Sequence, residues 1–349
     1  MKDYLEKLGV SSFEDGYKLV RQGTALIDGS GFGILKVSGD SAAEELNALV
    51  TKDVQFLNID TVSECLVLDE DASVLGSAFI CHLDTDFIVL TPPGSEKAAE
   101  KIASSLPTSK AEDLSGSQDL ICLEGPSSYK FVRDVLNVST DMLPLRGIEE
   151  KSDWNGYALI VMRIGRAGEY AYAVLGSAEA MEKAVDAVCA YGKEKGLSVG
   201  AAGEDVMKTC MLETLQPDFC TLPVAEENLF SLGLQWLIQY EKEEYCGHDA
   251  MLQLFNGENP SELVFFKAEG RKSVEAGAKV SLEGEEIGKV IQESFSPGLG
   301  CAFGSALIRK DLAVPGVEFT LSDKEGDCSI ETIASPVVRP LSWDQPMED

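Results

Sequence analysis

The chain has 349 residues, of which 44% are hydrophobic and 25% are charged, a composition typical of a globular protein. Lys and Arg total 29 and Asp and Glu total 59, so the formal net charge is −30. A surface this acidic repels phosphate backbones and anionic lipids, so we expect neither nucleic acid nor membrane as a partner. No apolar run reaches about 18 residues, and the acidic first residues lack the layout of a signal peptide.

Two segments in the first half of the chain have the same pattern of strand, turn and helix. In residues 33–50 an apolar strand leads to a turn at Gly39, and leucines then recur on one helical face. In residues 119–136 the strand ends at Gly125, and a Pro-Ser pair opens the helix. The pattern predicts two similar α+β units.

Each unit continues into further strands and a second helix that is opened by a Gly-Ser pair. The first kind of turn repeats after 86 residues (39 to 125) and the second kind after 82 (94 to 176). Because the two kinds of turn repeat at nearly the same spacing, the sequence favours an internal duplication, although chance similarity of the patterns remains the alternative. A ligand site is expected where the two halves meet.

The pattern changes at about residue 261. Short alternating strands separated by glycine-rich turns follow, which is typical of a small all-β barrel or sandwich. We therefore expect an α+β region of two interleaved domains over residues 1–260 and a separate β domain over residues 261–349.

Cysteine and histidine provide little evidence for a metal or a nucleophile. The nine cysteines are scattered without a CxxC pair, which favours reduced thiols in the cytoplasm. The two histidines, His82 and His248, are too few for a histidine-rich metal site, and none is predicted. Cys246 and His248 lie only two residues apart and need not face each other, so a Cys-His nucleophile is disfavoured.

Weak motifs extend over almost the whole chain, from the first strand and turn to the β region. In chain order they contain Asp28, Gly39, Asp40, Leu46 and Asp53; Gly125 and Pro126; Arg163, Gly165, Gly168 and Glu169; Gly203 and Glu213; Gly233, Trp236, Lys242, Tyr245, Gly247 and Ala250; and Gly288, Ser296 and Pro297. The order of these motifs resembles that of the glycine-cleavage T-protein (aminomethyltransferase) family of folate-binding proteins.

The resemblance implies an α+β fold of three domains, two related α+β units and a C-terminal β-barrel, around a central channel for tetrahydrofolate. Members of the family pass an aminomethyl group from a lipoyl-carrier protein to folate, and relatives move methyl groups from sulfonium, ether or amine donors. Another branch serves iron–sulfur assembly through a cysteine whose position here is occupied by Glu244, which disfavours that function.

The sequence departs from the family where charge would be needed. The family's paired aspartates match Gly76 and Ser77, and an arginine on the closing helix matches Met211. The glutamate that grips the pterin matches Tyr172 if one deletion near Tyr170 is allowed. Because aminomethyl transfer needs a carboxylate near the reacting amine, standard glycine-cleavage activity is disfavoured.

Seven candidate residues for cofactor binding follow, and no catalytic acid or base is assigned. Arg163 and Arg166 could hold a carboxylate or the folate tail, or could pair with the abundant Asp and Glu. Trp236 is expected in the core or in the pocket wall. The resemblance alone assigns the others to the folate pocket, namely Glu169, Tyr172, Glu213 and Ser77.

We therefore expect a tetrahydrofolate-dependent one-carbon transferase, closer to the methyl-transferring demethylases than to the glycine-cleavage enzyme. Its partner would be a small-molecule methyl donor or a lipoyl-carrier protein. The alternative is a non-catalytic folate-binding or accessory protein on the same fold. A third possibility is aminomethyl transfer through a rearranged acid, with Asp71 or Glu213 in that role.

Overall fold

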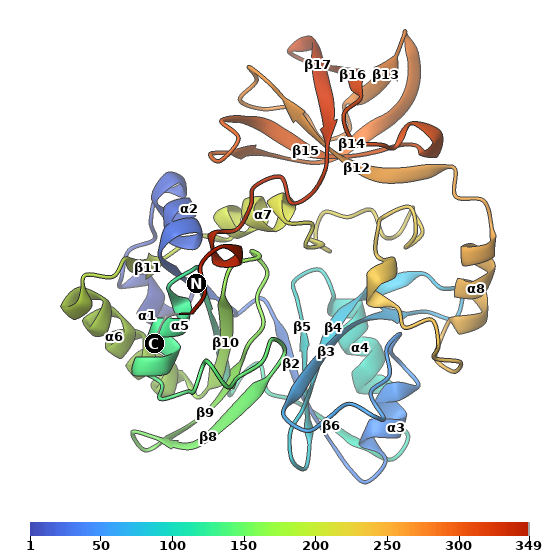
Figure 1. Ribbon diagram of the computed structural model, residues 1–349. Helices are drawn as coiled ribbons and strands as arrows, with labels where there is room; N and C mark the ends of the chain where they lie inside the picture. Colours follow the sequence, from blue (N-terminus) through green and yellow to red (C-terminus); the bar gives the residue numbers. More distant parts are fainter. Residues whose placement is uncertain (348–349) are drawn as a thin grey trace.

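The computed structural model describes residues 1–347 and contains two β-sheets and a β-barrel (Figure 1). The two sheets lie side by side, and the barrel lies beyond one end of them. Helix α7 (Glu204–Glu213) lies between the sheets and the barrel. The mixed α+β architecture with a C-terminal barrel confirms the predicted fold class.

The first sheet has six strands in the order β11-β1-β7-β10-β9-β8. Strand β1 pairs with β11 in parallel and with β7 antiparallel, so segments from both ends of the α+β region meet in one sheet. The strands are β1 (Thr24–Asp28), β7 (Asp119–Glu124), β8 (Ile148–Trp154), β9 (Tyr157–Met162), β10 (Ala171–Gly176) and β11 (Val199–Ala201).

The second sheet has five antiparallel strands in the order β3-β4-β5-β2-β6. Helix α4 (Glu96–Ser104) packs on it, and its buried face contributes Ala98 and Ile102. The strands are β2 (Gly33–Ser38), β3 (Thr61–Leu68), β4 (Val74–His82), β5 (Phe87–Thr91) and β6 (Lys110–Asp113).

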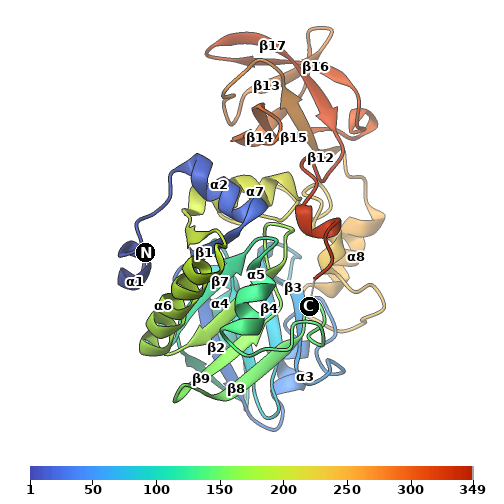
Figure 2. The ribbon, with the colours of Figure 1, turned by 60° about the vertical axis from the view of Figure 1, so that its left-hand side comes forward.

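The remaining helices lie around the two sheets, as the second view shows (Figure 2). Helix α6 (Ala178–Lys195) begins where the Ser177 hydroxyl accepts a bond from Ala180 N, and it is capped by Gly196 in the left-handed conformation that favours glycine. The others are α1 (Asp3–Glu6), α2 (Phe13–Gln22), α3 (Ala42–Asn47), α5 (Ser128–Asp134) and α8 (His248–Asn256), and the short 3₁₀ helix η1 (Gln235–Leu237) precedes α8.

The two predicted strand-turn-helix units have nearly the same backbone geometry. Strand β2 leads through Gly39 to α3 in the second sheet, and β7 leads through Gly125 to α5 in the first. The φ angles of the two glycines are +140° and +138°, a conformation that L side chains rarely adopt. The matched turns support the interpretation of the halves as related units.

The barrel closes in the order β12-β15-β14-β13-β16-β17. Its strands are β12 (Ser261–Ala268), β13 (Lys279–Leu282), β14 (Glu285–Ser296), β15 (Cys301–Arg309), β16 (Glu318–Asp323) and β17 (Gly326–Ile333), and a short 3₁₀ turn, η2 (Lys310–Leu312), follows β15. After β17 the chain leaves the barrel and returns to the first sheet, where it forms η3 (Leu341–Trp343).

The interface between the two sheets is filled with apolar side chains. Phe79 and Ile88 from the second sheet belong to the same buried cluster as Ala173 and Leu175 from the first. At this interface the Cys81 thiol lies 3.5 Å from the sulfur of Met162. Close packing of this kind stabilises the pair of sheets and leaves a ligand only the space beyond the packed cluster.

None of the helices within residues 1–347 combines the length and apolar character that a membrane crossing requires. In the same residues, no group of three or more His, Cys, Asp or Glu side chains is arranged to hold a metal ion.

Candidate functional site

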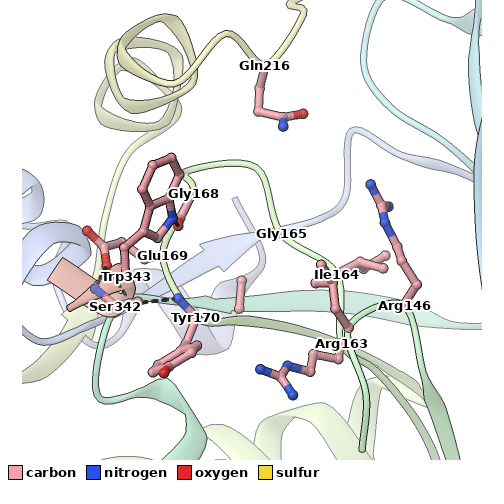
Figure 3. A pocket seen from close by; sticks show the side chains of 12 residues that line it. Arg146, Arg163, Ile164, Gly165, Gly168, Glu169, Tyr170, Gln216, Ser342 and Trp343 are labelled. Atoms are coloured by element: carbon pink, nitrogen blue, oxygen red, sulfur yellow. Dashed lines mark hydrogen bonds between the residues drawn. The ribbon is translucent and has the colours of Figure 1, made fainter. Parts of the chain in front are cut away.

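A central cavity of about 300 Å³ opens where the turn from β9 to β10 meets the loop after α7 and the end of the chain (Figure 3). Its volume is at the lower end of the range for small-molecule sites. The lining residues are Leu145, Arg146, Arg163, Ile164, Gly165, Gly168, Glu169, Tyr170, Ala171, Gln216, Ser342 and Trp343.

The glycine-rich turn between β9 and β10 needs its glycines for steric reasons. A Cβ at Gly165 would overlap the Cβ of Ala171, and Gly168 has a φ of +78°. The turn therefore folds tightly against the start of β10 and places the side chains of Arg163, Glu169 and Tyr170 around the cavity.

Two arginines provide the positive charge of the cavity. Arg163 donates through Nη1 to the carbonyl of Leu143 at 2.6 Å, and its guanidinium carbon lies 5.8 Å from the centre of the Tyr170 ring. Arg146 forms an ion pair with Glu64 and lies 5.3 Å from the centre of the Phe79 ring. Both guanidiniums can pair with a carboxylate in the cavity.

Arg163 belongs to a motif of the sequence, whereas Arg146 does not. Arg146 lies at the seam of the two sheets, where its N–H donates to the carbonyl of Arg163 and its carbonyl accepts from Val62 N. Its φ of +67° is unusual for a residue with a side chain. No motif of the chain marks this position, so only the fold reveals it.

The Glu169 carboxylate is fully buried and bonded on both oxygens. It accepts from Leu341 N at 3.0 Å and from the amide and hydroxyl of Ser342 at 2.9 and 2.5 Å. Arg21 contributes a further contact at 3.3 Å. Glu169 lines the cavity, but its carboxylate holds residues 341 and 342 and is not free for a ligand.

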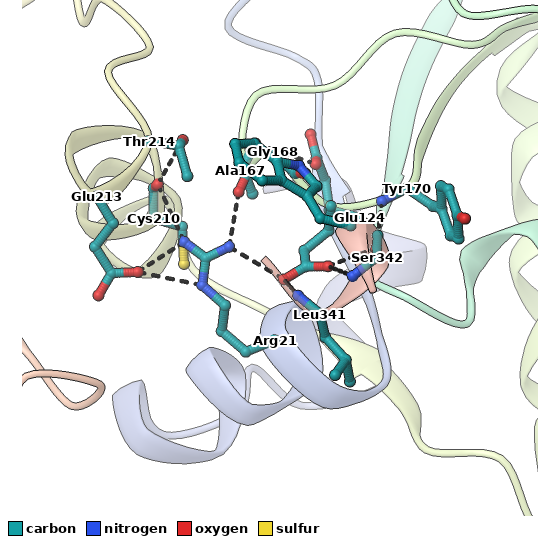
Figure 4. A network of polar contacts seen from close by, with 12 residues as sticks. Arg21, Glu124, Ala167, Gly168, Tyr170, Cys210, Glu213, Thr214, Leu341 and Ser342 are labelled. Atoms are coloured by element: carbon teal, nitrogen blue, oxygen red, sulfur yellow. Dashed lines mark hydrogen bonds and ion pairs between the residues drawn. The ribbon is translucent and has the colours of Figure 1, made fainter. Parts of the chain in front are cut away.

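Glu213 belongs to the same polar network and lies outside the residues that line the central cavity (Figure 4). It accepts from Arg21 at 2.7 Å, from the Tyr17 phenol at 2.9 Å and from the Ser296 hydroxyl at 2.6 Å. Glu213 therefore ties α2, α7 and the barrel together, and its expected contact with folate stays a prediction.

Tyr172 and Ser77 also lie away from the central cavity. Tyr172 has no exposed surface, because its ring packs in the cluster between the first sheet and its outer helices, and this burial raises the pKa of its phenol. Ser77 is 1% exposed in β4, and its N–H donates to the Ser95 hydroxyl. The structure brings neither side chain to the cavity.

Arg166 and Trp236 line two other cavities. Arg166 shares a space of about 250 Å³ with Lys208 and Cys220, and its guanidinium pairs with Glu204 at 3.4 Å. Trp236 is 43% exposed beside an apolar hollow of about 60 Å³. Of the seven predicted residues, only Arg163 and Glu169 line the central cavity.

The backbone at Gly76 leaves no room for an acidic side chain. Its φ is +144°, and a Cβ placed there would lie 2.5 Å from the Cβ of Ser95. The start of α4 thus occupies the space that an aspartate at this position would need. An acid here would require both a strained backbone and a displaced helix.

A buried carboxyl group, Glu124, lies behind the glycine-rich turn. It ends β7 and accepts from Arg166 N at 2.9 Å and from Ala167 N at 3.4 Å. Burial raises the pKa of Glu124 to about 7. The sequence does not indicate Glu124, since the residue ends an apolar strand and belongs to no motif.

Lys242, one of the motif residues, has a structural role. Its ammonium donates to the carbonyls of Asn47, Val50 and Lys52 at 2.5, 2.6 and 3.0 Å. Burial lowers the pKa of Lys242 to about 8. The lysine satisfies carbonyls at and beyond the end of α3 that no helical partner can reach.

Comparison with known families agrees with this architecture. Residues 4–242 match the model of the GCVT N-terminal domain, and residues 262–338 match the glycine cleavage T-protein C-terminal barrel domain. The chain belongs to the glycine cleavage T-protein family. The resemblance found in the sequence is thereby confirmed.

Individual relatives of the T-protein family are distant. The aminomethyltransferase of Halothermothrix orenii is 25% identical over 335 residues, 94% of this chain and 92% of the relative. That of Thermotoga neapolitana is 25% identical over 316 residues, 88% and 84% of the two chains. The crystal structure of the glycine cleavage system aminomethyltransferase T from Bartonella henselae superposes with a TM-score of 0.83 at 20% identity, covering 96% of both chains, which shows the shared fold.

The lining of the central cavity fits part of the folate that the T-protein family implies. Arg146 and Arg163 can pair with the carboxylates of its glutamyl tail, and the rings of Tyr170 and Trp343 can pack against its aromatic part. The only carboxylate in the lining is that of Glu169, which is already bonded. A folate would therefore be held here by charge and stacking.

Proposed function

We propose that this T-protein relative is a tetrahydrofolate-dependent one-carbon transferase of the methyl-transferring, demethylase type. The observation that carries the proposal is the backbone at Gly76, where Ser95 takes the place of an acid. Release of ammonia from an aminomethyl group needs a nearby carboxylate. A methyl group on a sulfonium needs none, because the donor leaves as a neutral thioether and the proton released by the methylated folate nitrogen passes to water.

The residues of the central cavity would act by binding and orienting. Arg146 and Arg163 hold the anionic tail, and Tyr170 fixes the ring between the tail and the interior. Bound tetrahydrofolate supplies the nucleophilic nitrogen that accepts the one-carbon unit. The donor would be a small methylated molecule, and a lipoyl-carrier protein is the alternative donor for the aminomethyl reaction.

The test is titration calorimetry with tetrahydrofolate, followed by assay of 5-methyltetrahydrofolate with S-methylmethionine as the sulfonium probe. We expect saturable binding and methyl transfer. Absence of binding at high micromolar ligand, with the protein shown to be folded by circular dichroism, would contradict the proposal.

A second candidate is a non-catalytic folate-binding or accessory protein on the same fold. It is favoured by the lining of the central cavity, in which the single carboxylate, Glu169, has both oxygens bonded within the protein. Tight binding of tetrahydrofolate without turnover of sulfonium, ether or amine donors would select this candidate over the transferase.

The cysteines support a cytoplasmic location for this activity. All nine are unpaired, and five of them are buried. Burial raises the pKa of the Cys65 and Cys122 thiols to about 12, so these groups stay protonated and unreactive. A chain with nine free thiols suits a reducing compartment.

A further inference from the structure

Helix α8 lies at the outer edge of the molecule, on the right in Figure 1, and carries one of three aromatic rings that contact one another. The centre of the Phe255 ring lies 5.7 Å from that of Phe230 and 5.3 Å from that of Tyr240. Phe255 is 52% exposed and Tyr240 is 41% exposed. Single exposed apolar side chains are common, but rings in contact form a patch, and exposed apolar patches mark interaction sites.

The apolar core under α8 ends before it can cover these rings. Met251 is 1% exposed and belongs to the buried cluster that also contains Leu237 and Tyr245. Phe255 follows Met251 by one helical turn on the same face, near the end of α8 at Asn256. The rings therefore continue the core outward and stay partly uncovered.

The stretch of chain that holds the three rings is almost free of basic residues. Residues 222–260 contain seven acidic residues and, apart from His248, a single basic one, Lys242. The Lys242 ammonium donates to three backbone carbonyls inside the molecule. Its charge is thus directed inward, away from the exposed glutamates on either side of it.

Six glutamates lie within four positions of one of the rings in the chain. They are Glu226, Glu227, Glu241, Glu243, Glu244 and Glu258. Within residues 1–347 none of them forms an ion pair, whereas on the barrel Glu285, Glu286 and Glu331 each pair with a basic side chain. We call the three rings and these six glutamates the aromatic–acidic surface.

The aromatic–acidic surface favours a cation that has an apolar body. Ring faces attract ammonium and guanidinium groups, and carboxylates without a partner add to the attraction. The chain contains one such contact, since the Lys52 ammonium lies 5.7 Å from the ring centre of Trp236, four positions before Tyr240. The same carboxylates repel an anionic lipid, a nucleic acid or a second copy of this chain, whose net charge is −30.

We propose that the aromatic–acidic surface is a docking site for a basic segment of another protein. Arginine or lysine side chains of that segment lie on the rings of Phe255 and Tyr240 and pair with the glutamates, and apolar side chains between them cover the ring edges. The surface lies outside the lining of the central cavity, so the inference does not depend on folate binding.

The experiment measures the Kd of a labelled peptide in which arginine and leucine alternate, by fluorescence anisotropy with the full chain at physiological salt. Phe255→Ala keeps the net charge and is expected to raise the Kd about tenfold, because it removes a ring that a cation covers. Glu243→Gln combined with Glu244→Gln is expected to raise the Kd about fivefold.

Two matched variants control for exposure and for charge. Trp343→Ala removes a ring that is 57% exposed at the central cavity, and Glu14→Gln combined with Glu318→Gln removes two exposed carboxylates on α2 and β16. Both controls are expected to bind the peptide as the parent does.

A Kd that rises with Phe255→Ala and not with Trp343→Ala supports the docking site. Equal Kd values for the parent and Phe255→Ala would overturn it, since the peptide would then be held only by the general negative charge of the chain. Absence of binding to the folded parent overturns it as well. So does a parent dimer in sedimentation velocity that Phe255→Ala dissociates, because a second copy would then occupy the surface. If Phe255→Ala does not fold, Tyr240→Ala provides the same measurement.

Discussion

The two sheets of the α+β region have diverged from the T-protein pattern to different degrees. On the side of the first sheet, Arg163, Gly165, Gly168 and Glu169 match the T-protein pattern and build a tight turn. On the side of the second sheet, the matching acid is absent, and Gly76 packs against Ser95. The residues that match the family pattern shape the backbone of the turn. The acid that is absent at Gly76 would have placed negative charge beside a reacting amine.

The largest expected effect is a loss of stability from the polar network in which Arg21 contacts Glu169 and Glu213. Arg21→Met removes the cation that contacts both Glu169 and Glu213, which leaves two buried carboxylates without it. We expect a loss of about 3–5 kcal/mol in the free energy of unfolding. Urea unfolding measures it, with Lys18→Met on the exposed face of the same helix as the control. An unchanged urea midpoint for Arg21→Met would contradict the role of this network.

The next prediction concerns Gly76 in strand β4 of the second sheet. Gly76→Asp restores the family's acid but forces a side chain into a φ of +144° and against Ser95. We expect a loss of about 2–4 kcal/mol in the free energy of unfolding and no gain of aminomethyl transfer. The control is Gly116→Asp, since a Cβ there meets no atom within 4 Å. A stable Gly76→Asp variant that releases ammonia would show that this side is only one substitution from the standard reaction.

A smaller effect on the free energy of unfolding is expected from Glu124, which lies behind the glycine-rich turn between β9 and β10. Burial raises its pKa from the ordinary 4.5 of a glutamate to about 7, so the folded protein prefers the neutral acid. The stabilisation from this group is complete below about pH 4.5 and is lost as the pH rises through about 7. Between pH 5 and pH 8 we expect the parent to lose about 1–3 kcal/mol more than Glu124→Gln, measured by urea unfolding at both pH values. Equal losses in the two proteins would show that Glu124 ionises at an ordinary pKa.

The smallest effect is expected from Arg163 at the surface of the cavity. Arg163→Lys keeps the charge and loses the planar fork, so the Kd for tetrahydrofolate is expected to rise about fivefold to tenfold with little change in stability. Calorimetric titration measures the Kd, and the urea midpoint provides the check on folding. A Kd within twofold of the parent would place the anionic tail elsewhere.

The sequence predicted the backbone of this protein better than it predicted the lining of its cavity. The repeated glycines at 39 and 125 predicted two related turns, because a backbone with positive φ favours glycine and the sequence shows where glycine occurs. The match at Tyr172 assumed a one-residue deletion, and a shift of one residue in a strand exchanges its buried and cavity-facing sides. Alternation along β10 therefore placed the tyrosine in the outer core.

Contacts between distant parts of the chain could not be predicted in the same way. Glu169 is bonded by residues 172 and 173 positions further along the chain, beyond the barrel. Arg146 reaches the cavity from a left-handed backbone position that carries no motif. Both depend on how the barrel and the two sheets come together, and no local pattern records that arrangement.

The most direct test of the central claim compares two reactions in one preparation. Formation of 5-methyltetrahydrofolate from a sulfonium donor is measured beside release of ammonia from an aminomethyl-lipoyl carrier protein, each with tetrahydrofolate at saturation. A cavity without a free carboxylate is expected to support the first reaction and not the second. Ammonia release as fast as, or faster than, methyl transfer would contradict the account.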